Sequence, residues 1–262
     1  MDSIIRYLWK VNLPNRRGLY LKRLMYRKLF GERRIKFQTK YGVVMMLDPA
    51  EIIDGDILIE GYWEPEVLEA IRASLREGDV FWDIGGNLGT HSMTIKKLMP
   101  SVTVIAFEPN PLMYSLFESS AKLNDLDIKI HKFGLSDKES QADFFVYTGL
   151  NYGKSGLHGP NETSKSKPIQ VELRTGDQLI QKGVPAPHVI KVDIEGHELF
   201  AFRGMTNLLS GDTLRTIILE DRPDADSPVK MLLGKNGFRL RELSPPRYMS
   251  HTDYVDYVAE KK

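Results

Sequence analysis

Short apolar runs alternate with amphipathic segments, and from residue 79 onward the alternation is regular. Short apolar runs between turn signals predict strands, whereas apolar residues at helical spacing predict helices. We expect strands at 80–84, 102–107, 128–133, 142–147, 169–173, 188–192, 216–219, 238–243 and 254–259. We expect helices at 65–76, 90–98, 111–124, 176–182 and 227–235, and the start of another at 197–202. Ahead of these, 34–40 and 43–47 flank Tyr41-Gly42 and predict a hairpin.

The order of these elements predicts the fold class. Strands separated by helices pair in parallel through right-handed crossovers. The central runs are almost wholly apolar, as in strands buried on both faces: VFWDI, VIAF, VIKV and TIIL. No helix separates the last two predicted strands, so they should pair antiparallel. We predict an α/β fold with a doubly wound, mostly parallel sheet and one antiparallel last strand at its end.

The strongest motif is Asp83-Ile-Gly-Gly-Asn-Leu-Gly89, which follows a predicted strand and opens a predicted helix. Glycines in such a turn permit positive φ angles and let a ligand approach the backbone. A dinucleotide-binding fold holds a pyrophosphate at a similar turn. Asp83 disfavours such a fold and an NAD-dependent oxidoreductase, because a carboxylate there would repel phosphates. It suits S-adenosylmethionine, which carries an ammonium and a sulfonium group and no phosphate.

A second acidic residue, Glu108, ends the next predicted strand, 25 positions beyond Asp83. In nucleotide-binding folds of this kind, an acidic side chain there accepts hydrogen bonds from ribose hydroxyls. The alternative is a carboxylate that merely stabilises the N-terminus of the helix beginning at Pro111. Together with the glycine loop, Glu108 favours the ribose interpretation.

Several ionisable residues follow the strand at 188–192, in the segment Lys191-Val-Asp-Ile-Glu-Gly-His-Glu198. Ligands bind at the carboxyl ends of the strands in an open parallel sheet. Asp193, Glu220 and Asp221 should converge there, and three carboxylates repel unless something neutralises them. A divalent metal such as magnesium is one solution, and it could lower the pKa of a substrate hydroxyl. The other solutions are contact with a cationic cofactor, or pairing with Lys191, Arg203 or Arg222.

Six motifs in order resemble those of the FkbM-type methyltransferases, over roughly residues 60–222. They are Tyr62-Trp-Glu-Pro65, Asp83-Ile-Gly-Gly-Asn-Leu-Gly89, Phe107-Glu-Pro-Asn110, Gly134-Leu-Ser-Asp137, Val192-Asp-Ile-Glu-Gly196 and Ile218-Leu-Glu220. One departure is Gly86, where the family is expected to carry alanine. The resemblance implies a class I methyltransferase, Rossmann-like fold. It also implies S-adenosylmethionine-dependent O-methylation of a hydroxyl on a sugar, glycan or glycosylated natural product.

The resemblance also implies where the cofactor binds. Together with Asp83, the expected cofactor-binding residues are Glu64, Gly85, Asn87, Gly89, Glu108, Pro109, Gly134, Leu135, Ser136 and Asp193. By this resemblance the glycine loop flanks the methionine part and Glu108 the ribose. The Gly134-Leu-Ser136 segment lines the adenine side, and Glu64 approaches the methionine end.

Methyl transfer to a sugar hydroxyl needs a group that takes the hydroxyl proton, because hydroxyls are weak nucleophiles. The catalytic candidates are Asp193, Glu195 and His197. A histidine has an ordinary pKa suited to this task, and His197 follows Gly196 near the strand edge. The alternatives are that His197 caps the next helix and faces solvent, and that Asp193 or Glu195 positions a substrate. The polar loop at 149–167 could close over the substrate as a lid.

The net charge of +1 hides a strongly basic N-terminal segment. Residues 1–40 contain 12 Lys/Arg and 2 Asp/Glu, which leaves 24 and 33 for residues 41–262. Its apolar residues at helical spacing are Leu21, Leu24, Met25 and Leu29. Such a helix either packs its apolar stripe on the domain, or lies on an anionic membrane or another polyanion through residues 6–40. We expect a helix-and-hairpin extension over 1–50 and the S-adenosylmethionine-binding domain over 51–262.

Composition excludes several classes of protein. Without cysteine, a disulfide scaffold, a thiolate metal site and a cysteine nucleophile are impossible. No apolar run approaches a membrane span and no secretory signal is evident, so we expect a cytoplasmic protein, at the inner membrane surface if residues 6–40 bind lipid. The basic N-terminus leaves an RNA methyltransferase as an alternative, although Asp193-Ile-Glu-Gly196 stands where base-directed enzymes carry an Asn/Asp-Pro-Pro-aromatic segment. A non-catalytic cofactor-binding scaffold is the other alternative.

Overall fold

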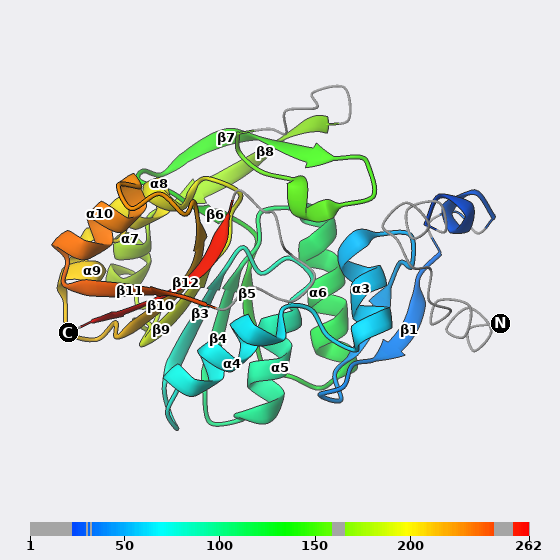
Figure 1. The fold of residues 1–262 in the computed structure, drawn as a ribbon, viewed down its shortest axis with the longest axis horizontal. Helices are drawn as coiled ribbons and strands as arrows, with labels where there is room; N and C mark the ends of the chain where they lie inside the picture. Colours follow the sequence, from blue (N-terminus) through cyan, green and yellow to red (C-terminus); the bar gives the residue numbers. More distant parts are fainter. Residues whose placement is uncertain (1–22, 30, 32, 159–165, 244–253, 262) are drawn as a thin grey trace.

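The computed structural model describes residues 23–29, 31, 33–158, 166–243 and 254–261. Its main element is a seven-stranded sheet with helices on both faces (Figure 1). The strand order is β11-β12-β10-β9-β3-β4-β5. These strands are β3 (Val80–Ile84), β4 (Thr103–Phe107), β5 (Lys129–His131), β9 (Val189–Val192), β10 (Thr216–Asp221), β11 (Phe238–Glu242) and β12 (Val255–Lys261). The strands predicted for these segments are confirmed.

The pairing of the last strand differs from the prediction in one respect. All pairs from β5 to β10 are parallel, whereas β12 runs antiparallel to both of its neighbours, β10 and β11. One antiparallel strand is therefore confirmed, but its expected position at the end of the sheet is wrong. The chain reverses after β11, and β12 inserts between β11 and β10 with Asp256 opposite Glu220.

Helices cover both faces and bury alternate residues of each strand. One face carries α4 (Pro65–Ser74), α5 (Thr90–Leu98) and α6 (Pro111–Leu123). The other carries α7 (Gly176–Gln181), α8 (Glu198–Arg203), α9 (Thr206–Ser210) and α10 (Pro228–Lys235). In β3, Phe81 packs in the cluster with α4, and the next residue, Trp82, packs in the cluster with α8. Because successive side chains point to opposite faces, such a strand must be apolar throughout.

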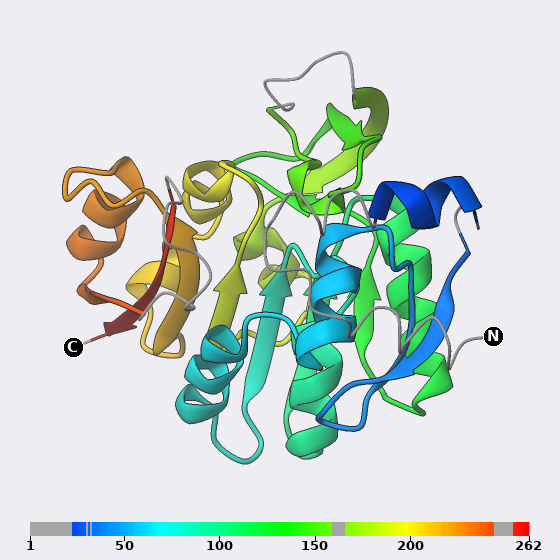
Figure 2. The same ribbon diagram turned by 45° about the vertical axis from the view of Figure 1, so that its right-hand side comes forward.

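A second, three-stranded sheet stands above the carboxyl edge of the main sheet (Figure 2). Its strands are β6 (Gly134–Leu135), β7 (Ser140–Tyr147) and β8 (Ser166–Arg174), and the 3-10 helix η1 (Tyr152–Lys154) follows β7. The predicted lid partly overlaps this region, with residues 159–165 outside the described ranges. Its described part is held in place, because Ile52 N donates to Leu150 O at 2.8 Å and Phe145 pairs with Gly156.

The N-terminal elements share a hydrophobic cluster with the main domain. The predicted hairpin is confirmed as β1 (Ile35–Gln38) and β2 (Val44–Leu47), and the unpredicted helix α3 (Ile52–Glu60) follows. Met45 lies in one cluster with Leu88 and Phe117. Within the described part of the chain, no helix combines the length and apolar character needed to cross a bilayer.

The helix of residues 23–29 presents its charged side to the domain. Arg23 and Arg27 form ion pairs of 2.7 to 3.0 Å with acidic residues around α3: Asp48, Glu51 and Asp56. Three apolar side chains are exposed by 40, 62 and 69 %: Leu24, Met25 and Leu29. The alternative in which this apolar stripe packs on the domain is therefore wrong. The helix is held by these ion pairs and by Tyr26, which is buried in the cluster that contains Met45. Membrane contact through residues 6–40 stays a prediction, and Leu21 lies outside the described residues.

Alanine at Gly89 should cost stability for two reasons. Its φ is +76°, and an added Cβ would clash with the ring of Phe117. We expect Gly89→Ala to lower the free energy of unfolding by about 3 kcal/mol, measured by urea denaturation. Gly86→Ala is the matched control, because Gly86 lacks a positive φ and its Cβ would lie 3.1 Å from Phe117 Cε1. The control should lose less than about 1 kcal/mol, and equal losses would contradict this account.

Candidate active site

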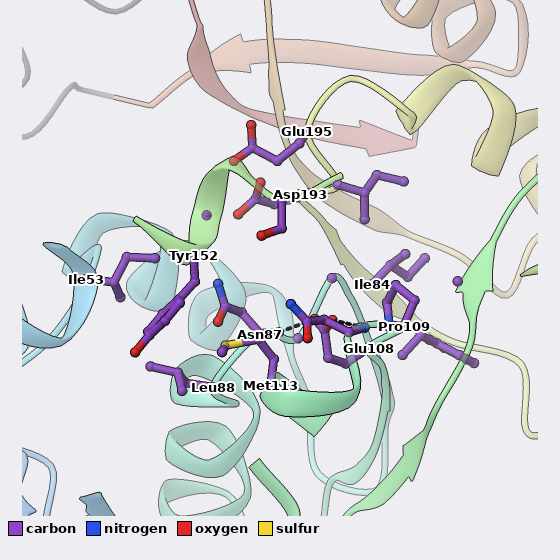
Figure 3. A pocket seen from close by; sticks show the side chains of 18 of the residues that line it. Ile53, Ile84, Asn87, Leu88, Glu108, Pro109, Met113, Tyr152, Asp193 and Glu195 are labelled. Atoms are coloured by element: carbon purple, nitrogen blue, oxygen red, sulfur yellow. Dashed lines mark hydrogen bonds between the residues drawn. The ribbon is translucent and has the colours of Figure 1, made fainter. Parts of the chain in front are cut away.

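A cavity of about 320 Å³ lies at the carboxyl ends of β3, β4, β9 and β10 (Figure 3). Most predicted site residues line it: Glu64, Gly85, Asn87, Glu108, Pro109, Gly134, Leu135, Asp193, Glu195, His197 and Glu220. The remaining predicted residues do not line it: Asp83, Gly89, Ser136 and Asp221. The sheet edge that the topology singles out for ligands therefore forms one pocket.

The glycine loop passes the end of β9 at very close range. Gly85 and Gly86 donate their backbone N–H groups to Phe107 O at 3.0 and 3.1 Å. Gly85 has a φ of +82°, and an added Cβ there would clash with the carbonyl oxygen of Asp193. Gly85 is thus required because the backbone of Asp193 approaches it closely. The sequence predicted only that a ligand would approach the glycine loop.

Glu108 joins the glycine loop to the turn after β4. Its Oε2 accepts from Asn87 N at 2.8 Å, and its Oε1 accepts from Asn110 N at 2.7 Å. Burial raises the pKa of Glu108 to about 7, although these two donors lower it. Each carboxylate oxygen can accept a second hydrogen bond, so Glu108 can hold the loop and still accept from a ribose hydroxyl. The helix cap itself is Asn110, whose Oδ1 accepts from Leu112 N at 3.0 Å.

Lys191 is a buried cation between two carboxylates. Its Nζ lies 3.3 Å from Asp193 Oδ2 and 3.8 Å from Asp83 Oδ1, and it donates to Gly85 O at 3.3 Å. Burial opposes the charge, but Asp193 and Asp83 raise the Lys191 pKa above its ordinary value. Asp83 also accepts from Ser92 Oγ at 2.6 Å and is 1 % exposed. Asp83 therefore acts on the pocket through Lys191, and its position does not support the predicted direct contact with a cofactor.

Carboxyl groups crowd the end of the pocket away from Glu108. Figure 3 shows Asp193 and Glu195 at this end, and Glu64 and Glu220 also line the pocket. Burial, followed by the charge of Asp193, raises the pKa of Glu195 to about 8 and that of Glu220 to about 9. Burial also raises the Glu64 pKa. Near neutral pH, Glu64, Glu195 and Glu220 therefore tend to hold protons.

Two histidines line the pocket in neutral form. Burial, followed by the charge of Lys191, lowers the pKa of His91 to about 4. Burial, followed by His158, lowers the pKa of His197 to about 4. The two ring nitrogens of His197 lie 3.0 Å from Ser136 Oγ and 3.2 Å from His158 Nε2. His197 does occupy the N-cap position of α8, but its side chain makes no capping hydrogen bond, and at 7 % exposure it does not face solvent.

The three-carboxylate metal site is not formed. Glu220 and Asp221 are successive residues of β10, so their side chains point to opposite faces of the sheet. Asp221 accepts instead from Ser227 Oγ at 2.5 Å. Across the described ranges, no group of three or more His, Cys, Asp or Glu side chains is arranged to hold a metal ion. The alternative of pairing with Lys191 is confirmed for Asp193.

The sequence analysis missed the part of the pocket wall that α3 forms through Ile52 and Ile53. The neighbouring part, formed by Asn151, Tyr152 and Leu157, belongs to the loop that was expected to cover the substrate. Arg34 Nη2 donates to Tyr152 Oη at 2.7 Å, and Arg34 Nη1 lies 3.1 Å from Asp54 Oδ2. An arginine of the basic segment thus positions a pocket residue 118 positions away. Its charge alone could not reveal this role.

The polar atoms of the pocket fit S-adenosylmethionine. Among the described residues, Asn87 Oδ1 and His91 Nε2 are buried without a hydrogen-bond partner. Buried polar atoms in folded proteins nearly always have one, so a ligand with hydrogen-bond donors would satisfy them. S-adenosylmethionine offers an ammonium group, ribose hydroxyls and the adenine amine. Asn87 and Glu108 are the residues suited to hold it.

The sequence of this chain is similar to those of known methyltransferases. The model of the methyltransferase FkbM domain matches residues 83–240. Hexuronic acid methyltransferase AglP of Haloferax volcanii is 31% identical over 171 residues, covering 64% of this chain and 67% of that protein. The 31-O-demethyl-FK506 methyltransferase FkbM of Streptomyces tacrolimicus is 24% identical over 196 residues, covering 63% of this chain and 75% of that protein. The crystal structure of methyltransferase FkbM from Methylobacillus flagellatus KT aligns with a TM-score of 0.49 and 16% identity, covering 92% of this chain and 58% of that chain.

The inserted antiparallel strand, the glycine loop and the pocket beside Glu108 define a class I methyltransferase with a Rossmann-like fold. The chain belongs to the methyltransferase FkbM domain family, and is an S-adenosylmethionine-dependent methyltransferase. The resemblance to this family is thereby confirmed, and five of the six motifs lie within the matched residues, all but Tyr62-Trp-Glu-Pro65.

Raised carboxyl pKa values should make stability fall as pH rises. Carboxyl groups of an unfolded chain titrate near about pH 4, so the folded protein holds more protons than the unfolded chain up to the raised pKa. The folded pKa values are about 8 for Glu51 and Glu195 and about 9 for Glu220. The lowered histidine pKa values act in the opposite sense only below about pH 6.5, where unfolded histidines are protonated.

We therefore expect the free energy of unfolding, measured by urea denaturation, to decrease from about pH 6.5 to about pH 9. Glu220→Gln should make this decrease smaller, because it removes one titrating group. Glu139→Gln is the control, since Glu139 is an exposed partner of Lys182. A profile that is flat or rises over this range would be incompatible with the raised pKa values.

Proposed function

We propose that the protein transfers a methyl group from S-adenosylmethionine to a hydroxyl group of a sugar, glycan or glycosylated natural product. The pocket beside Glu108, in a chain of this family, is the observation that most supports the proposal. Two relatives are named for a hexuronic acid and for 31-O-demethyl-FK506, which favours acceptors of this kind. The segment Asp193-Ile-Glu-Gly196 stands where base-directed enzymes carry an Asn/Asp-Pro-Pro-aromatic segment, which weighs against the RNA alternative.

The family resemblance assigns two functional ends to the pocket. Glu108 would accept hydrogen bonds from the ribose hydroxyls, and the Gly134-Leu135 segment would line the adenine side. Gly85, Asn87 and Glu64 would hold the methionine part. When bound, S-adenosylmethionine supplies a methyl group on positively charged sulfur, and the carbon–sulfur bond breaks with its electron pair left on sulfur as the acceptor oxygen takes the methyl.

The hydroxyl proton passes to a carboxylate at the acidic end. Glu195 is the most suitable of the three candidates, because it lines the pocket and its pKa of about 8 is near the working pH. Asp193 is already ion-paired with Lys191 and positions the acceptor. His197 is a weak base, since its pKa is about 4 and both ring nitrogens have partners.

Binding of S-adenosylhomocysteine tests the cofactor assignment without an acceptor. We expect micromolar affinity by calorimetric titration, and a loss of at least about tenfold in Glu108→Ala. Glu118→Ala is the control, because Glu118 is a partly exposed partner of Lys122 on α6. Thermal melts would establish that both variants are folded. No binding at millimolar concentration to folded wild-type protein would contradict the assignment.

A second experiment tests transfer and the base. The protein is incubated with methyl-labelled donor and a panel of neutral, amino and uronic acid pyranosides, and labelled product is separated by chromatography. Glu195→Gln should lower kcat by about 100-fold while changing the affinity for S-adenosylhomocysteine by less than about threefold. His197→Asn should lower kcat by less than about tenfold. The reverse order of effects would assign the base to His197, and binding without any transfer would favour the scaffold alternative.

A further inference from the structure

The acidic end of the pocket holds more carboxyl groups than the surrounding cations neutralise. Glu64, Asp193, Glu195 and Glu220 line it, and Asp256 stands directly opposite Glu220 on the neighbouring strand. Among the described residues, the cations that act on these groups are Lys191 and Lys154. Lys191 is already shared between Asp193 and Asp83. A ligand that brings positive charge would therefore be favoured at this end.

Two residues of this acidic group have backbone conformations that are unfavourable for residues with a side chain. Glu64 and Glu195 have φ angles of +48° and +54°, in a region that residues with a side chain rarely adopt. Such conformations persist where the surrounding structure imposes them, and they concentrate at functional sites.

A separate observation points to a ligand at the same end. His91 lines the pocket, is 6 % exposed, and its Nε2 has no hydrogen-bond partner among the described residues. The backbone of Glu64 acts on the same imidazole as a hydrogen-bond partner, which places His91 beside the acidic group. A neutral histidine nitrogen can also face a cationic ligand without repulsion.

We propose that Glu64, Asp193, Glu195 and Glu220 recognise the sulfonium charge of the methyl donor, so that the pocket binds the charged donor more tightly than the neutral thioether product. The inference rests on the proposed function. Methyl transfer removes the charge from sulfur, so the attraction present before the reaction is lost after it. The same group of carboxyls thus favours donor binding and product release.

Binding of the charged donor should release protons from the carboxyl groups of the pocket. The pKa values of Glu195 and Glu220 are about 8 and about 9, so both carboxyls hold protons near neutral pH. A nearby positive charge favours the ionised form. Binding of the charged donor therefore expels a proton, which leaves a carboxylate ready to accept the proton of the acceptor hydroxyl. The neutral thioether lacks this effect.

Calorimetric titration of the intact protein tests this with three ligands at about pH 7.5. They are S-adenosylmethionine, S-adenosylhomocysteine and sinefungin, in which an amine-bearing carbon replaces the sulfonium. Each titration is run in phosphate and in Tris, because buffers of different ionisation enthalpy report the number of protons released. The α-ammonium group is common to all three ligands, so the difference between them reports the charge at the sulfur position.

We expect the two charged ligands to bind about tenfold more tightly than the thioether and to release about one proton more. Glu220→Gln should reduce both differences and leave the affinity for S-adenosylhomocysteine unchanged. Asp256 does not line the pocket, but its charge raises the Glu220 pKa. Asp256→Asn should therefore lower the Glu220 pKa and reduce the proton release. Glu139→Gln, at an exposed ion pair, should change nothing.

The outcomes separate this inference from the function on which it rests. If all three ligands bind with equal affinity and equal proton release, the inference is overturned and the cofactor assignment stands. If none binds to folded protein, the cofactor assignment fails and the inference fails with it. If both Glu220→Gln and Asp256→Asn still prefer the charged ligands to the thioether as strongly as the wild type does, the inference is also overturned, because other residues would then recognise the charge.

Discussion

The ion pairs of one buried ammonium group hold the site together. Lys191 of β9 lies between Asp83 of β3 and Asp193, which directly follows β9, and it also donates to Gly85 of the loop. A charge taken out of water is tolerated only when it is paired and hydrogen-bonded. Three segments must therefore stay in register at this point.

Glu108, which follows β4, also fixes the position of the glycine loop. Its two carboxylate oxygens accept from backbone N–H groups of two segments, the glycine loop and the turn before α6. The two acidic residues that mark the ends of β3 and β4 therefore have unlike tasks. Asp83 sits beneath the loop and balances Lys191, whereas Glu108 borders the pocket and keeps lone pairs for a ligand.

Local patterns predicted most of the fold, because the spacing of apolar residues follows the elements themselves. The parts that failed depend on distant partners. The insertion of β12 between β11 and β10 follows from pairing across the chain, and the ion pairs that turn the helix of 23–29 involve acids up to 33 positions away. The predicted approach of Asp221 to Glu220 is wrong for a different reason, because successive residues of one strand point to opposite faces of the sheet.

The site was predicted where chemistry and strand ends coincide, as at Glu108, Asp193 and Glu195. The apolar part of the wall on α3 was not predicted. The sequence around an isoleucine on a helix does not indicate whether its side chain lines a pocket or packs in the core. The close approach of Gly85 to Asp193 was equally hidden, because a glycine motif does not say which neighbour demands the missing side chain.

Arg34 lies ahead of the residues that match the family, yet it contributes to the binding site. The family match begins at residue 83, yet Ile53 and Glu64 line the pocket and Arg34 fixes Tyr152 in its wall. A chain cut back to the matched region would keep the glycine loop and Glu108 but lose one side of its own binding site. Variation ahead of the shared core is therefore a place where relatives with the same cofactor loop could acquire different acceptors.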